Sequence, residues 1–119
     1  MSKIVQAVNA MISNPSNITN VLHNDGEYFF LYKKKYKWST RQSETGINLF
    51  FYPTNLSLET LCRFDSDDWQ GFSEMIVYRD SDIGTKEAKS SFQELYTVVK
   101  EKVFGIDEML NDIINDDPF

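Results

Sequence analysis

The spacing of apolar residues changes twice along this chain of 119 residues, and no other sequence feature limits the fold as much. Residues 2–13 place apolar side chains at helical spacing, residues 28–52 form short aromatic or alternating runs typical of strands, and residues 85–114 return to helical spacing. Strands joined by short connections favour antiparallel pairing, and flanking helices would cover one face of the sheet. The sequence therefore predicts an α+β fold with an N-terminal helix or helices, an antiparallel sheet of about four or five strands, and two C-terminal helices packed on the sheet.

The N-terminal segment predicts one amphipathic helix and a second short one. Ser2 is a suitable N-cap for the first helix, which Asn14 and Pro15 end. The same Asn-Pro pair also fits the cap and first position of a following helix. That second helix would place three apolar residues on one face, namely Ile18, Val21 and Leu22.

The middle of the chain predicts strands separated by turns. We expect strands over residues 28–32, 36–41, 47–52 and 73–79, with a hairpin turning near Lys34 and Lys35. Residues 56–62 fit a strand or a short helix equally well, and residues 65–68 and 80–84 read as a loop and a turn.

The last third predicts two helices and a polar tail. Thr85 is positioned to cap a helix over residues 86–104, and Gly105 is suited to end it. Asp107 is a candidate cap for a last helix that reaches residue 114. We therefore expect a single domain over residues 1–114 and an acidic tail over residues 115–119.

Composition favours a cytoplasmic protein. Cys62 is the single cysteine, so no internal disulfide can form. Polar residues interrupt the apolar run at the N-terminus, which is unlike a signal peptide, and no stretch approaches the roughly 18 apolar residues of a membrane span. The reducing cytoplasm is the expected compartment.

The residues that usually carry catalysis are nearly absent. His23 is the single histidine and stands 39 positions from Cys62, so the sequence does not predict a nucleophile and base in contact. A structural zinc site needs four ligands, usually Cys or His, and the chain has only one residue of each type. The Asp-rich segments do not match the spacing of a calcium-binding loop. We therefore expect no enzyme activity, no metal and no cofactor.

The uneven charge favours a protein-binding surface. Residues 1–60 carry six basic and four acidic groups (net +2), whereas residues 61–119 carry six basic and fourteen acidic groups (net −8). An acidic half of this kind suits a partner with a basic face, as in small acidic inhibitors and immunity-type proteins. The candidate binding acids are Asp65, Asp67, Asp68, Asp80 and Asp82.

A basic and aromatic segment supports an alternative hypothesis. Lysines interleaved with aromatic residues on a hairpin bind phosphates while their rings stack on bases. The alternative is therefore an accessory protein that binds single-stranded nucleic acid. Its candidate residues are Lys33, Lys34, Lys35, Lys37, Trp38 and Arg41.

The C-terminal tail adds one more candidate. The run Asp116-Asp117-Pro118-Phe119 resembles the acidic tip of bacterial single-stranded DNA-binding proteins, although the hydrophobic residue before the proline is missing. The resemblance implies that Phe119 anchors a protein partner. That family begins with strands, whereas this chain begins with a helix, so the resemblance covers only the tip. The sequence leaves the partner and the oligomeric state open.

Overall fold

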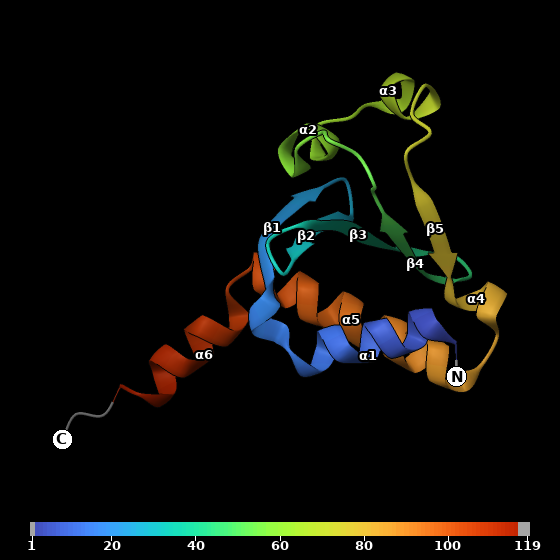
Figure 1. The fold of residues 1–119 in the computed structure, drawn as a ribbon. Helices are drawn as coiled ribbons and strands as arrows, with labels where there is room; N and C mark the ends of the chain where they lie inside the picture. Colours follow the sequence, from blue (N-terminus) through green and yellow to red (C-terminus); the bar gives the residue numbers. More distant parts are fainter. Residues whose placement is uncertain (1, 117–119) are drawn as a thin grey trace.

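The computed structural model describes residues 2–116 (Figure 1). Five strands form one antiparallel sheet, and each strand pairs with the next along the chain, in the order β1-β2-β3-β4-β5. The strands are β1 (Ile18–Asn24), β2 (Glu27–Tyr32), β3 (Tyr36–Ser43), β4 (Gly46–Phe51) and β5 (Ile76–Arg79). The helices are α1 (Lys3–Ser13), a 3₁₀ turn η1 (Pro15–Asn17), α2 (Leu58–Cys62), α3 (Ser66–Gln70), α4 (Asp80–Ile83), α5 (Lys86–Val103) and α6 (Ile106–Ile114).

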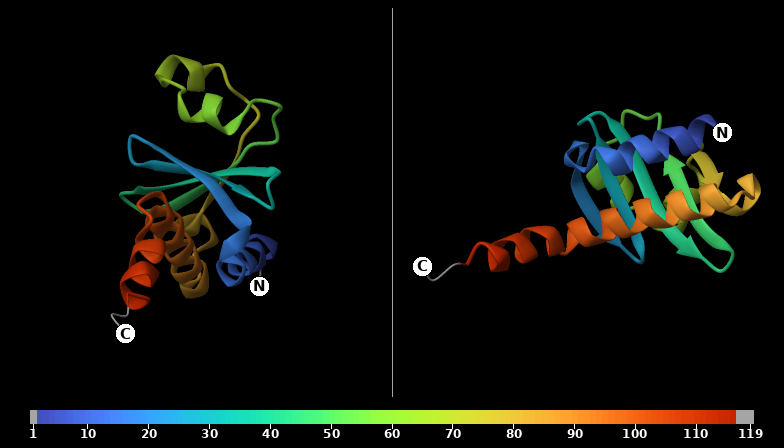
Figure 2. Two further views of the ribbon diagram at one scale, coloured as in Figure 1. Left: turned by 90° about the vertical axis from the view of Figure 1, so that its left-hand side faces the viewer. Right: turned by 90° about the horizontal axis from the view of Figure 1, so that it is seen from below.

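The two faces of the sheet are covered by different helices. The α5 face carries α1 and α5, and the opposite α3 face carries α2 and α3 (Figures 1 and 2). Strand β2 explains why both faces need a cover. Its residues Tyr28, Phe30 and Tyr32 join the core on the α5 face, whereas Phe29 and Leu31 join a smaller cluster on the α3 face. A strand that is apolar on both sides is stable only between two layers.

The predicted α+β class is confirmed. The structure has an N-terminal helix, an antiparallel sheet of five strands and C-terminal helices, of which α4 and α5 pack on the sheet. The Ser2 hydroxyl accepts the Val5 N–H at 3.4 Å as the N-cap of α1, and the Thr85 hydroxyl accepts the Ala88 N–H at 3.0 Å at the start of α5. Of the two alternatives for residues 56–62, the helix is the one that forms, as α2.

The predicted second N-terminal helix forms only as the 3₁₀ turn η1, with Asn14 at its cap position and Pro15 at its first position. Its continuation over Ile18, Val21 and Leu22 is wrong, because residues 18–24 form strand β1. The register of β1 against β2 shifts between Thr19 and Leu22, and Asn20 has a left-handed φ of 56°. This bulge inserts a residue, so Ile18 and Val21 pack on the same face although they lie three positions apart. The bulge gives a strand the apolar spacing of a helix.

The predicted loop at residues 65–68 is also wrong, because it opens helix α3. The Asp65 carboxylate accepts the Asp68 N–H at 2.9 Å, and the Asp68 carboxylate accepts the Asp65 N–H at 3.0 Å. This reciprocal pair is a capping box, which satisfies two free donors at the helix start. The predicted turn after β5 contains a single helical turn, α4, before Gly84 with φ 76°.

The C-terminal helix α6 extends beyond the sheet. It begins at Ile106, so Gly105, with φ 63°, occupies the cap position that we had assigned to Asp107. It continues from the end of α5 past the edge of the sheet (Figures 1 and 2), and the molecule measures 58 × 33 × 27 Å. Within the described part of the chain, no helix is both long and apolar enough to cross a membrane.

Candidate functional site

A groove of about 620 Å³ lies between α1 and the α5 face of the sheet. Helix α1 forms its wall with Ala7, Ala10, Met11 and Asn14, which share one side of the helix. Larger residues of α1, such as Val5 and Val8, are buried elsewhere in the core. The two alanines leave the space between helix and sheet unfilled, and this is why the groove exists.

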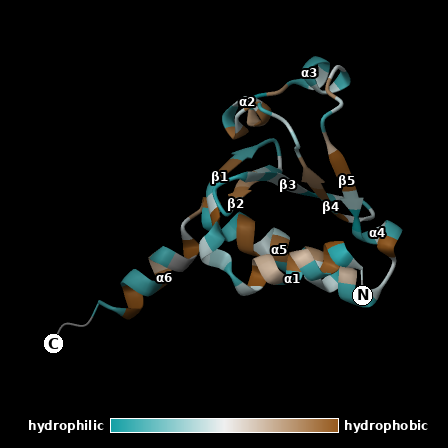
Figure 3. Cartoon of the chain, viewed as in Figure 1, coloured by the Kyte–Doolittle hydropathy of each residue, from teal (hydrophilic) through white to brown (hydrophobic). Residues whose placement is uncertain are grey.

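The floor of the groove is a row of apolar side chains across neighbouring strands. Trp38 is paired with Phe51, and Phe51 is paired with Ile76 in β5. The Trp38 and Phe51 ring centroids are 4.9 Å apart. Along this row, Trp38 is 9% exposed and Ile76 is 44% exposed. The apolar floor therefore opens toward the β5 edge of the sheet, where β5 and β4 are coloured hydrophobic in Figure 3.

One groove-lining residue has a buried polar atom without a partner among the described residues. The indole Nε1 of Trp38 is buried and makes no hydrogen bond, although a buried N–H without an acceptor is costly. The groove also reaches Lys33 in the turn between β2 and β3, and Lys33 is exposed. A ligand that fills the groove gains stability if it is apolar and carries negative charge near Lys33.

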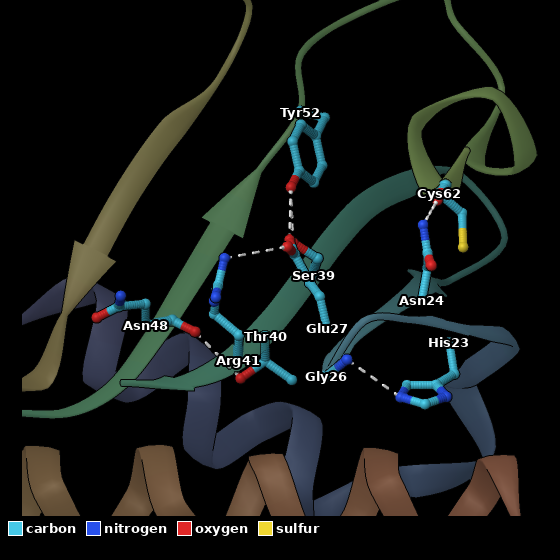
Figure 4. A network of polar contacts seen from close by, with 10 residues as sticks. All are labelled: His23, Asn24, Gly26, Glu27, Ser39, Thr40, Arg41, Asn48, Tyr52 and Cys62. Carbon is cyan, nitrogen blue, oxygen red and sulfur yellow. Dashed lines mark hydrogen bonds and ion pairs between the residues drawn. The ribbon is translucent and has the colours of Figure 1, made fainter. Parts of the chain in front are cut away.

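A second site lies on the α3 face, where a polar network surrounds Glu27 (Figure 4). The Ser39 hydroxyl donates to Glu27 Oε2 at 2.5 Å, and the Tyr52 hydroxyl lies 2.6 Å from Ser39 Oγ and 3.2 Å from the same Glu27 oxygen. An Arg41 nitrogen lies 3.9 Å from the other oxygen of Glu27. Trp69 of α3 lines two small hollows next to Glu27 and Arg41.

The Glu27 network is better suited to holding the sheet together than to catalysis. Burial raises the pKa of Glu27, and the hydrogen bonds from Ser39 and Tyr52 and the charge of Arg41 oppose that rise. Burial is also the largest cause of a raised pKa at Tyr52. Ser39 is 0% exposed, so a substrate cannot reach its hydroxyl. The network joins β2, β3 and the end of β4 on one face.

The predicted acidic binding residues do not form one surface. Asp65 and Asp68 cap α3, and Asp67 lies exposed beside them. Asp80 is 4% exposed and packs against Gly46, and Asp82 pairs with Arg79 at 3.7 Å. Helices α3 and α4 lie at opposite ends of β5 (Figure 1). The acids therefore divide into two structural groups.

The predicted basic residues are also divided. Lys33, Lys34 and Lys35 lie exposed in the β2–β3 turn. Beyond the turn, β3 alternates, so Trp38 packs on the α5 face whereas Arg41 contacts Glu27 on the α3 face. The Lys37 ammonium donates to the Thr54 carbonyl at 2.7 Å. Of the turn lysines, Lys33 lines the groove, whereas Lys35 lines a separate hollow together with Lys37.

Among the described residues, the histidine and the cysteine do not form a catalytic pair or a metal site. The Gly26 N–H donates to His23 Nε2 at 3.3 Å, and the His23 ring stacks on Tyr28, on the α5 face. Cys62 belongs to the cluster on the α3 face, and burial raises the pKa of its thiol. Among residues 2–116, no group of three acidic, histidine or cysteine side chains is arranged to hold a metal ion. Phe119, the predicted anchor of the tail, lies outside the described residues.

No family model matches this chain, and no curated protein or solved structure matches it significantly.

Sequence reasoning missed the groove as a site, although its parts were visible. Ala7 and Ala10 stand on one side of a predicted helix whose other apolar residues are larger, and this difference is a signal for a shallow helix surface. The nucleic-acid hypothesis uses Trp38 to stack on bases, whereas in the structure Trp38 belongs to the groove floor. Nothing in the sequence places Ile76 of β5 beside Phe51 of β4, because that pairing depends on the long connection through α2 and α3.

Proposed function

We propose that this protein is a non-enzymatic binding protein whose groove between α1 and the sheet receives an amphipathic helix of a partner protein. An immunity-type inhibitor is one member of this class. The observation that carries the proposal is the groove floor, an apolar cross-strand row of Trp38, Phe51 and Ile76. Recognition of an amphipathic helix by an apolar groove is a common mode of protein binding.

The helical wall and the charge of the groove favour a helix over other ligands. Its wall is itself a helix, so a second helix laid beside α1 would cover the exposed part of the same sheet face. Apolar residues at helical spacing would contact Phe51 and Ile76. Acidic residues on the flank of that helix would lie near Lys33, whose ammonium has no ion-pair partner among the described residues.

The proposal is tested by titrating amphipathic helical peptides that share one apolar face and differ in whether their polar flank is acidic or basic. The indole N–H of Trp38 gives a separate resonance in a nitrogen-resolved NMR spectrum, so binding at the groove is observed directly. We expect the acidic peptide to shift this resonance. Ala10→Phe fills the groove and should abolish the shift, whereas Ser13→Phe, an exposed position of α1 outside the groove, should preserve it.

Two results would contradict the proposal. One is that neither peptide shifts the Trp38 resonance, and the other is that Ala10→Phe binds as well as the wild type. A parallel titration with single-stranded DNA tests the nucleic-acid hypothesis, which stays a prediction. That hypothesis requires binding that weakens steeply with salt and is lost when Lys33, Lys34 and Lys35 are replaced by alanine.

A further inference from the structure

Helix α6 carries an apolar face that is exposed among the described residues. Met109 is 44% exposed, Leu110 47%, Ile113 61% and Ile114 75%, and Phe104 before the helix is 61% exposed. Positions 109, 110 and 113 share one side of a helix because they are three or four residues apart. Figure 3 shows hydrophobic residues on α6 well outside the sheet. A contiguous exposed apolar face of this kind marks a contact surface.

The same helix has the chemistry that the groove requires. Its polar positions include Glu108 and Asp112, Asp116 follows it, and the chain has no basic residue after Lys102. The groove offers an apolar floor and reaches Lys33, in the turn that also carries the exposed Lys34 and Lys35. Opposite charge at the rim selects the partner and orients it. Helix α6 and the groove are therefore complementary in both apolar character and charge.

A chain cannot place α6 in its own groove without rearrangement. Only Phe104 and Gly105 separate α6 from the end of α5, and α6 continues outward in the direction of α5 (Figure 2). Helices α1 and α5 lie side by side on the sheet, and no residue of α5 is among those that line the groove. To reach the groove in the same molecule, α6 would have to reverse direction and cross α1.

We infer that α6 of a second copy occupies the groove, so that two chains exchange their C-terminal helices in a symmetric dimer. This inference rests on the proposed function of the groove and names its occupant. Each α6 lies beside α1 of the other chain and covers Trp38, Phe51 and Ile76, and its acids face the lysine turn. A two-fold arrangement closes the assembly, because both grooves and both helices are used. A partner helix would then have to displace α6.

The test is the oligomeric state of the full chain, measured by sedimentation velocity over a range of concentrations. The wild type should be a dimer. Leu110→Ser with Ile113→Ser removes the apolar face of α6, and Ala10→Phe fills the groove. Each change should raise the dissociation constant about tenfold or more, since the first removes buried apolar contacts and the second blocks the groove sterically. All three residues are exposed in the single chain, so the folded domain should persist. Ser13→Phe is the matched control and should remain a dimer.

A cross-link shows whether the contact joins two chains. In a Cys62→Ser background, one chain carries Ile113→Cys and a second carries Ala7→Cys. Oxidation of the mixture should yield a disulfide between the two different chains.

The outcomes separate this inference from the proposed function. A wild type that is monomeric at every concentration overturns the exchange, and so does an Ala10→Phe variant that dimerises as well as the wild type. If the wild type is monomeric but the acidic peptide still shifts its Trp38 resonance, the groove binds helices and only the assignment of α6 as its occupant is wrong. If the peptide has no effect and the protein is monomeric, both ideas fail.

Discussion

At the scale of single residues, the buried carboxyl group of Glu27 should give the protein a characteristic dependence on pH. Burial raises the pKa of Glu27 from its ordinary value of 4.5, so the folded state favours the protonated form. A raised pKa stabilises the fold fully below the ordinary value, and this contribution is lost as the pH rises through the folded-state pKa. Relative to the wild type, Glu27→Gln should therefore gain free energy of unfolding as the pH rises from below 4.5 toward neutrality.

Urea denaturation of both proteins across this pH range measures the difference. A constant gap between Glu27→Gln and the wild type at every pH would show that Glu27 does not titrate differently in the folded and unfolded states.

The contact between Gly46 and Asp80 gives a second prediction at this scale. Gly46 has φ 148°, and a Cβ at this position would lie 2.8 Å from Asp80 Cγ. The Asp80 carboxyl is buried at the start of α4, so it cannot move freely. Gly46→Ala should therefore lower the free energy of unfolding by about 1–3 kcal/mol. In a double-mutant cycle, Asp80→Ala should recover part of that loss, because it removes the steric clash but not the unfavourable φ. Purely additive effects would contradict the contact.

At the scale of elements, the first turn of α3 shows that acids which looked like a binding site serve the fold. Asp65→Ala removes the capping box and should cost about 1 kcal/mol, whereas Asp67→Ala, an exposed neighbour in the same turn, should change stability by less than about 0.5 kcal/mol. Thermal unfolding of both variants measures the difference. Equal losses would mean that the negative charge of the turn matters and the cap does not.

The elements that sequence reasoning placed correctly are those whose pattern is set by local geometry. Strands β2, β3 and β4 follow from aromatic and alternating residues, and the start of α5 follows from Thr85 and the apolar stripe behind it. The prediction for β1 was wrong because the bulge at Asn20 shifts the alternation by one residue. The prediction for residues 65–68 was wrong because Asp side chains are common in loops and are equally suited to cap the start of a helix.

The groove could not be predicted for a different reason. It depends on how far Ala7 and Ala10 stand from Phe51 and Ile76, and that distance is set by the packing of α1 against α5. The Ser91 hydroxyl donates to Asn9 Oδ1 at 2.6 Å and joins these two helices across 82 positions of the chain. The sequence contains the residues that line the groove, but it does not show that α1 and α5 pack together. It therefore cannot predict how those residues are arranged.

At the scale of the whole molecule, the compact part and α6 should differ strongly in local stability. Phe30 is 0% exposed in the centre of the sheet, so its amide should exchange with solvent only on global unfolding. Helix α6 spans nine residues, and its main tertiary contact within the described part of the single chain is with α5. A helix of that length is marginal without tertiary contacts. The dimer would supply those contacts from the groove of the second chain.

This difference leads to a prediction for hydrogen exchange followed by mass spectrometry. At low micromolar concentration, peptides that cover α6 should exchange almost without protection, whereas peptides that cover β2 and β3 stay protected. At high micromolar concentration the protection of α6 should rise, together with that of residues 7–14 along the groove wall, because both surfaces become buried in one contact. The control is Leu110→Ser with Ile113→Ser, whose α6 should remain unprotected at both concentrations. Protection of α6 that is strong at the lower concentration, or equal at the two, would mean that α6 is stabilised within its own chain.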